Sequence, residues 1–141
     1  MAALVDTNIL VYRFDPRFPN KQTIATRLLR TGIEEDSVRL PHQAIVEFVA
    51  AVTRPIASGP SLLSVDDARQ EAEELLLQFT VLYPNDELVR MALGGVAAYR
   101  LSWFDAHLWA YAAYYGLPEI ISEDFQSGRF YGSVRISNPF V

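Results

Sequence analysis

Four carboxylates in this sequence stand among apolar neighbours, where a lone charge is costly unless a partner or a metal ion compensates it. Asp6 and Asp124 each follow a short apolar run. Glu47 lies within a helical apolar segment, and Asp105 lies in the first turn of another predicted helix. Carboxylates gathered at one place repel one another unless cations neutralise them. If the fold brings these acids together, they predict a cation site.

The chemistry that such a site supports is hydrolysis of phosphate esters. Oxygen ligands without cysteine or a pair of spaced histidines suit Mg²⁺ or Mn²⁺ rather than zinc. The ion binds a phosphoryl oxygen, lowers the pKa of water and stabilises the leaving oxygen. Other chemistries lack support, because the sequence has no G-x-x-x-x-G-K-[ST] loop and no G-x-G-x-x-G after a strand. His42 and His107 also lack a serine or cysteine in a nucleophile-elbow context.

Asp6 and Glu47 each have a structural alternative that the local sequence leaves open. Asp6, or Thr7 or Asn8 behind it, could simply cap a following helix, because all three residue types are good N-caps. Glu47 could lie at the edge of an apolar helical stripe and reach solvent. Neither acid is therefore persuasive by itself.

The same holds for Asp105 and Asp124. Asp105 stands three residues after Ser102, which is the capping-box spacing, although Asp is a poorer reciprocal cap than Glu or Gln. Asp124 could be an ordinary turn acid, and its neighbour Glu123 competes with it for any role. The argument for chemistry therefore depends on all four acids sharing one edge of the fold.

The elements that would position these acids alternate between short strands and helices, which predicts an α/β fold with a parallel sheet covered on both faces. The expected strands span residues 2–5, 37–40, 80–83, 119–122 and 134–137. The expected helices span residues 20–31 (ending near Gly32), 43–53, 65–79 (capped by Ser64), 86–99 and 102–115, with a loop over 56–64. In such a sheet Asp6 and Asp124 follow strand ends on the same edge, where ligands bind in open α/β folds.

Length and composition place the chain among soluble single domains. Its 141 residues fit one domain spanning 1–141, and half of them are hydrophobic. The absence of cysteine excludes disulfides and suits a reducing compartment. The apolar stretches are too short to cross a bilayer. We expect a cytoplasmic protein without membrane association.

Charge is distributed unevenly along the chain, although the net charge of −5 argues weakly against nucleic-acid binding. Residues 1–33 contain five basic and two acidic side chains, whereas residues 34–87 contain three basic and eleven acidic ones. Eleven of the twelve basic residues are arginine, whose planar fork suits phosphate. The first third of the chain is therefore able to face a polyanion while the acidic middle faces solvent.

Four segments together resemble one known family. LVDTNILVY, QAIVEFVAAVTRP, WFDAHLWAYAAYYG and IISEDFQSGRFYGSVRISNPF resemble, in this order, the PIN-domain nucleases, and in particular the VapC-type toxins of bacterial toxin–antitoxin pairs. The resemblance runs from Leu4 to Phe140. It implies a three-layer α/β/α sandwich around a central parallel sheet, which agrees with the pattern of the elements.

The resemblance also implies roles for particular residues. The metal-ligating and catalytic carboxylates would be Asp6, Glu47, Asp105 and Asp124, with Mg²⁺ or Mn²⁺ as the cofactor. Thr7, Asn8 and Ser122 would support them. The implied reaction is in-line hydrolysis of an RNA phosphodiester by metal-activated water, which leaves a 5′-phosphate and a 3′-hydroxyl. The candidates for contacts with the RNA backbone are Arg13, Arg17, Lys21 and Arg129.

Two positions depart from the family's pattern. Related sequences often have an acid where this chain has Ser127, so a second metal ion would have fewer ligands and occupancy by one ion is plausible. Pro41-His42 replaces the usual small polar entry to the helix that carries Glu47. That change affects the wall of the site and leaves Glu47 in place.

The implied partners are a cognate antitoxin protein, which we expect to insert a cation among the acids, and a second copy of the chain. Weak support for a homodimer comes from aromatic-rich helices. The aromatic residues concerned are Trp103, Trp109, Tyr111, Tyr114 and Tyr115, for which simple core packing is the alternative.

Two other functions remain as alternatives. A catalytically silent PIN-like RNA-binding module would have lost one of the acids, and none is missing. A phosphatase of haloacid-dehalogenase type would need a second aspartate at the position of Asn8 and a downstream lysine, and the one lysine of the chain is Lys21.

Overall fold

The strands and helices alternate along the chain as the hydrophobic pattern predicts. The computed structural model describes residues 1–57 and 59–141. The strands are β1 (Ala3–Val5), β2 (Val38–Pro41), β3 (Thr80–Leu82), β4 (Glu119–Ile121), β5 (Phe130–Tyr131) and β6 (Val134–Ser137). The helices are α1 (Thr7–Tyr12), α2 (Pro19–Glu35), α3 (His42–Thr53), α4 (Val65–Gln78), α5 (Asp86–Tyr99) and α6 (Trp103–Tyr114).

The strands form one six-stranded sheet in the order β3-β2-β1-β4-β6-β5. All neighbouring pairs are parallel except β5 and β6, which pair antiparallel at the edge. Ala3 pairs with Val38 of β2 on one side of β1 and with Glu119 of β4 on the other. The central strand β1 therefore ends between β2 and β4, and the residue that follows it lies at the middle of the sheet's carboxyl edge.

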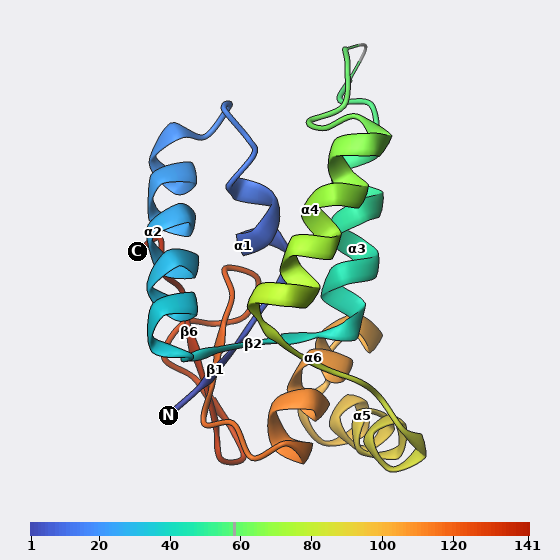
Figure 1. Ribbon diagram of the computed structural model, residues 1–141. Coiled ribbons are helices and arrows are strands. Elements are labelled where there is room, and N and C mark those ends of the chain that lie inside the picture. The colour runs from blue at the N-terminus through green and yellow to red at the C-terminus, as the bar shows by residue number, and fades with distance from the viewer. Residues whose placement is uncertain (58) are drawn as a thin grey trace.

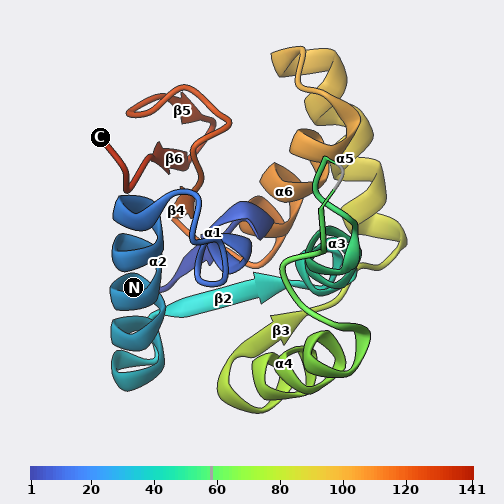
Figure 2. The ribbon, with the colours of Figure 1, turned by 90° about the horizontal axis from the view of Figure 1, so that it is seen from above.

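Helices cover both faces of this sheet, which confirms the predicted three-layer α/β/α sandwich. Leu4 faces a core shared with α5 and α6, whereas its neighbour Val5 faces a core shared with α1 to α4. Successive strand residues point to opposite faces, so a strand buried on both sides is apolar throughout. In Figure 1, α1 to α4 lie above β2 and α5 and α6 below it, and Figure 2 shows the same arrangement from above.

The helix boundaries follow the capping residues in the sequence. Ser64 accepts a hydrogen bond from the Asp67 N–H at 3.1 Å, as predicted for the start of α4. Asn85 caps α5 in the same way through the Leu88 N–H at 2.9 Å. Helix α3 ends because of Pro55. The residue before a proline, here Arg54, is held out of the helical region. Within the described residues, no helix is both long and apolar enough to span a bilayer.

Some predicted boundaries were wrong. The helix predicted to end near Gly32 continues to Glu35, and Asp36 ends it in the left-handed conformation. Gly32 is needed for packing instead, because a Cβ there would lie 2.4 Å from a methyl carbon of Val38 in β2. The short helix α1 and the edge strand β5 were missed, so the sheet is not wholly parallel. Part of the loop predicted over 56–64, residue 58, lies outside the described residues.

Candidate active site

Asp6 lies at the carboxyl end of β1, where the chain turns directly into α1. Its backbone N–H still donates to the Ile121 carbonyl of β4 at 3.0 Å, so the residue is fixed by the sheet. One carboxylate oxygen, Oδ1, accepts from the Thr7 N–H at 2.7 Å and caps α1. The other, Oδ2, accepts from the Ser122 hydroxyl at 2.7 Å. Asp6 therefore does cap a helix, as the alternative interpretation proposed, but only with one oxygen. Its other oxygen is bound by Ser122, which follows β4 and lies 116 residues away in the sequence.

Burial shapes the electrostatics of Asp6, whose residue surface is 8% exposed. Burial raises the pKa of Asp6 to about 6, and the negative charges of Asp124 and Glu47 act in the same direction. The hydrogen bonds from Ser122 and Thr7 oppose this rise. No Lys or Arg in the described part of the chain pairs with this carboxylate. The negative charge around Asp6 is therefore not compensated by a nearby cationic side chain.

The three predicted supporting residues each contact one of the predicted acids. Ser122 donates to Asp6 and also accepts from the Asp124 backbone N–H at 3.1 Å. The Asn8 side-chain amide donates to Asp124 Oδ2 at 3.2 Å. The Thr7 hydroxyl donates to Glu47 Oε2 at 3.3 Å, a longer and weaker contact. These contacts come from both strand ends and link α1 to α3.

Glu47 and Asp105 approach this group from two further helices. Glu47 is half-buried on α3, where Gln43 one turn earlier donates to its Oε1 at 3.4 Å. Asp105 lies in the first turn of α6, where its backbone N–H donates to the capping Ser102 hydroxyl at 3.1 Å, as the spacing predicted. Asp105 is near enough to raise the pKa of Asp124, although burial and Glu123 raise it more.

The acids lie at the carboxyl edge of the sheet, but their side chains are not arranged as a complete set of metal ligands. Among the described residues, no three His, Asp or Glu side chains are close enough together to hold one ion as they stand. Asp6, Glu47 and Asp124 line one pocket of about 480 Å³, whereas Asp105 is not part of its wall. The donor set is entirely carboxylate and amide or hydroxyl oxygen, and it carries uncompensated negative charge. Those two properties fit a hard divalent cation such as Mg²⁺ or Mn²⁺.

The competition between Glu123 and Asp124 is resolved by their contacts. Glu123 forms an ion pair with Lys21 Nζ at 2.8 Å and accepts a hydrogen bond from the Tyr12 hydroxyl. Lys21 also lies over the Tyr12 ring at 4.9 Å. Glu123 therefore has its own cation, and Asp124 is the acid of this pair that lines the pocket.

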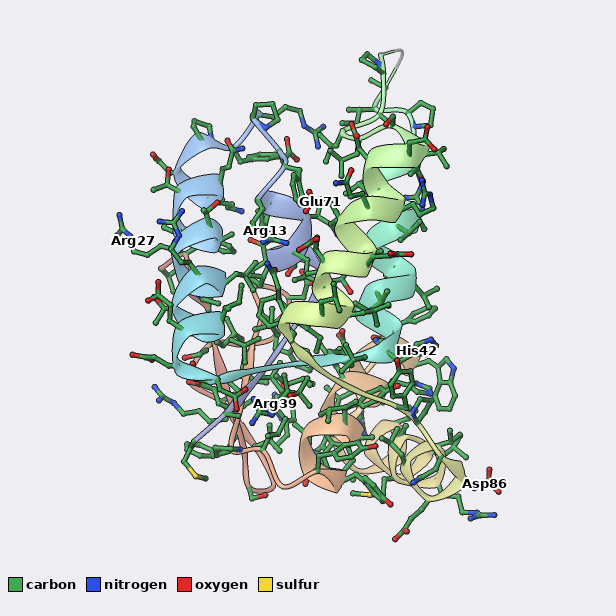
Figure 3. The ribbon with its side chains drawn as sticks, in the orientation of Figure 1. Arg13, Arg27, Arg39, His42, Glu71 and Asp86 are labelled. Carbon is green, nitrogen blue, oxygen red and sulfur yellow. The ribbon has the colours of Figure 1, made fainter. Side chains whose placement is uncertain are left out.

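The four predicted RNA-contacting side chains lie in different surroundings. Arg17 lines the pocket and makes a bidentate ion pair with Asp15. The Arg13 guanidinium is directed toward Glu71 between α1 and α4 (Figure 3), and burial lowers the pKa of Arg13. Lys21 is engaged with Glu123, and Arg129 is bonded to Gln126 at 3.0 Å.

Two charged residues of the pocket wall were not anticipated from the sequence. Asp15 is a buried acid paired with Arg17, and Arg54 closes the α3 side of the pocket. The signal for Arg54 was its position seven residues after Glu47, directly at the end of the same helix, which places both on the same side of α3. Of the two departures from the family pattern, Ser127 accepts from the Asn138 N–H at 3.2 Å, and His42 stacks on Tyr83 with ring centroids 5.3 Å apart.

Comparisons with known proteins agree with this fold. The family model described as PIN domain matches residues 3–131. A toxin–antitoxin complex from Klebsiella pneumoniae is similar with a TM-score of 0.68 at 19% identity, covering 98% of each chain. The structure of FitAB bound to an IR36 DNA fragment gives a TM-score of 0.72 at 20% identity, covering 99% of this chain and 96% of that one.

A third similar structure is Mycobacterium tuberculosis VapC20, described as a sarcin-ricin loop cleaving toxin. Its TM-score is 0.64 at 16% identity, and the match covers 87% of this chain and 90% of that one. Comparison with curated proteins by sequence gives no significant match. At these identities the structural likeness concerns the fold, and the family assignment rests on the matching family model.

Proposed function

Because this chain belongs to the PIN domain family, we propose that it is a metal-dependent endoribonuclease and the toxin of a toxin–antitoxin pair. Residues 1–141 would form its single nuclease domain. The observation that carries the proposal is Asp6. It is a buried carboxylate with a raised pKa, held by Ser122 and close to Glu47 and Asp124, and it has no paired cation among residues 1–57 and 59–141. Structural ion pairs do not need such an arrangement, whereas a cation-dependent site does.

The residues that would hold Mg²⁺ or Mn²⁺ are Asp6, Glu47, Asp105 and Asp124. When bound, such an ion activates water and neutralises charge on a phosphoryl oxygen. The chain's own contribution is orientation. Ser122 and Thr7 fix both oxygens of Asp6, and Asn8 fixes one oxygen of Asp124. Hydrolysis in line would leave a 5′-phosphate and a 3′-hydroxyl.

The first experiment is cleavage of labelled single-stranded RNA with Mg²⁺, with Mn²⁺ and with EDTA. We expect cleavage with either ion and none with EDTA. Glu47→Gln and Asp105→Asn should each lower the rate more than about 100-fold, a larger loss than typically follows the loss of an outer-shell partner. Asp124→Asn should lower it as well. Glu73→Gln, exposed on α4, is the matched control and should leave the rate unchanged. Equal cleavage by the Asp105 variant and the control would contradict the proposal.

The same cleavage assay separates the nuclease from a catalytically silent RNA-binding module. A silent module would bind the RNA and leave it intact with every metal tested. The retained set of four acids supports the nuclease. A phosphatase of haloacid-dehalogenase type has less support, because Asn8 donates to Asp124 instead of acting as an acid.

The proposed partners are RNA, a cognate antitoxin and a second copy of the chain, in the cytoplasm and without a membrane. Two of the similar structures are described as a toxin–antitoxin complex and as FitAB on DNA. An antitoxin arginine or lysine placed among the acids would supply the missing positive charge. If replacing every such antitoxin residue near the pocket by alanine leaves inhibition intact, that mode of inhibition is wrong.

Of the five aromatic side chains that supported a homodimer in the sequence, only two are exposed enough to contact a second copy. Tyr111 is buried, and Trp109 and Tyr114 pack against the core that the sheet shares with α5 and α6. Trp103 and Tyr115 are 42% and 39% exposed and remain available to a second copy. Light scattering at micromolar concentration should give twice the mass of one chain, and the mass of one chain would remove the proposal.

A further inference from the structure

The pocket that holds Asp6 continues as a groove between α1 and α3. On the α3 side its wall consists of Glu47, Ala50, Ala51 and Arg54. This is the i, i+3, i+4, i+7 spacing, which places four residues along one side of a helix. The two alanines between the charged residues leave the groove open along its length. Glu47 therefore lies at one end of this wall and Arg54 at the other.

Arg54 is placed at its end of the groove by the sequence that follows it. Pro55 holds Arg54 in an extended conformation (φ −78°, ψ 132°), so α3 stops at Thr53 and the arginine leaves the helix at its last turn. With a rise of 1.5 Å per residue, Arg54 lies roughly 10 Å from Glu47 along the helix axis. The Arg54 side chain makes no ion pair within residues 1–57 and 59–141.

A second arginine lies on the opposite wall, in the segment that joins α1 to α2. Arg17 Nε and Nη2 donate to the Asp15 carboxylate at 2.9 and 2.8 Å. The Asp15 side chain is 3% exposed, so it anchors the guanidinium to the buried part of the molecule. Arg17 Nη1 makes no hydrogen bond in the described part of the chain, and the Arg17 guanidinium also lies over the Phe18 ring at 5.4 Å. The arginine is thus fixed and keeps donors free.

The groove consequently carries charges of both signs. The acids Asp6, Glu47 and Asp124 line it, and so do Arg17 and Arg54, with Arg54 at the opposite end of the α3 wall from Glu47. A metal-neutralised phosphate beside the acids leaves a second, un-neutralised phosphate of the same strand to be bound elsewhere. Arginine is the side chain best suited to that task, because its planar fork matches phosphate oxygens.

We propose that Arg54 and Arg17 form a subsite for a backbone phosphate that flanks the phosphodiester being cut. The subsite reads the sugar–phosphate chain and not the bases, so it sets affinity and register rather than sequence preference. The inference rests on the proposed ribonuclease function.

The test combines one protein change with one change in the RNA. Arg54→Gln removes the free charge from an exposed position at a helix end, so folding should be unaffected. Arg27→Gln is the matched control, because Arg27 projects from the outer side of α2, away from α1 and α3 (Figure 3). The RNA change replaces single phosphates on either side of the cleaved bond, one at a time, by uncharged methylphosphonates.

For the parent we expect one flanking methylphosphonate to raise KM about 10-fold with kcat unchanged, the usual size of a lost charged hydrogen bond. Arg54→Gln should raise KM on the all-phosphate RNA by a similar factor. It should also lower the slope of log affinity against log salt by about 0.7, the value for one contact with a single strand. In Arg54→Gln the same methylphosphonate should then have a clearly smaller effect than in the parent, because the phosphate retains its contact with Arg17 alone.

Dissociation constants measured by fluorescence anisotropy in the Asp105→Asn protein give the same comparison without any cleavage. A parent that fails to cleave RNA would contradict the proposed function, and the anisotropy series would still decide the subsite. A parent that cleaves while Arg54→Gln and Arg27→Gln behave alike would overturn the subsite and leave the nuclease intact. If Arg54→Gln changes the mass in light scattering and not KM, the residue belongs to a protein contact, and the subsite is equally wrong.

Discussion

Replacing Asp6 by asparagine should stabilise the metal-free protein while abolishing cleavage. Asp6 is 8% exposed, and its pKa rises from 3.8 to about 6 in the folded state. At pH 8 the carboxylate is ionised in both states, so its burial opposes folding by about 3 kcal/mol, the energy that corresponds to that rise. Well below pH 3.8 the group is protonated in both states, and this penalty disappears.

The sign of the pH dependence follows from the same values. Because the folded state binds the Asp6 proton more tightly, the parent's stability falls as pH rises through the window from 3.8 to about 6. The amide of the Asp6→Asn variant carries no proton to release in this range, so the variant lacks this loss. The amide oxygen can still accept from the Thr7 N–H, and the amide nitrogen can donate to Ser122 in place of the bond that Ser122 now donates. We allow about 1 kcal/mol for the weaker second bond.

The expected difference is therefore about 2 kcal/mol in favour of Asp6→Asn at pH 8, or about 7 °C in Tm for a domain of this size. Near pH 4 the variant should be equal to the parent or slightly less stable. The assay is urea unfolding in EDTA at several pH values between 4 and 8, with Glu73→Gln as the control. Excess Mg²⁺ or Mn²⁺ should stabilise the parent by about 2.7 kcal/mol at 100 times Kd, and Asp6→Asn should lose most of that gain. A stability difference that does not change with pH would refute the reasoning, and full RNA cleavage by the variant would refute the assignment of Asp6.

Two further predictions concern residues that the site and the core depend on. Ser122→Ala should lower the rate of RNA cleavage about 10- to 100-fold, because Asp6 Oδ2 loses its hydrogen-bond donor, and removal of an outer-shell partner usually has an effect of this size. Cleavage kinetics measure this loss. An unchanged rate would show that Asp6 does not need Ser122 to orient it. Gly95→Ala should destabilise the protein by about 1–3 kcal/mol in urea unfolding, because the new Cβ would lie 2.8 Å from the Trp109 ring. Gly94→Ala, one residue earlier on α5 and with no atom within 4 Å of a new Cβ, should instead stabilise by about 0.5–1 kcal/mol, and similar effects of the two changes would contradict this packing.

The sequence determined the order of the elements and the positions of the acids along it. Capping residues such as Ser64 and Ser102 mark helix starts through bonds to residues three positions away, so they are readable without the fold. Asp6 was recognisable as the acid that follows a buried strand. The α/β class followed from the same local periodicity, because strands buried on both faces are short and apolar throughout.

Elements too short to show a period were missed. Four of the six residues of α1 form an apolar run without a readable period. The segment is helical because Asp6 caps it and its apolar side faces α3. The two residues of β5 become a strand only through pairing with β6 at the edge of the sheet. A period needs more than one turn or two residue pairs to appear in a sequence, so such elements are decided by what they pack against.

Tertiary structure alone decided which charges were already paired. Glu123 and Asp124 are adjacent in the sequence, yet Lys21, 102 residues from Glu123, binds the first and leaves the second at the pocket. In the same way Arg13 is turned toward Glu71, whereas Arg54 remains unpaired within the described residues and enters the pocket wall. Charged side chains are long and interact over several ångströms in all directions, so their partners depend on how the strand ends and helices come together and leave no periodic trace in the sequence.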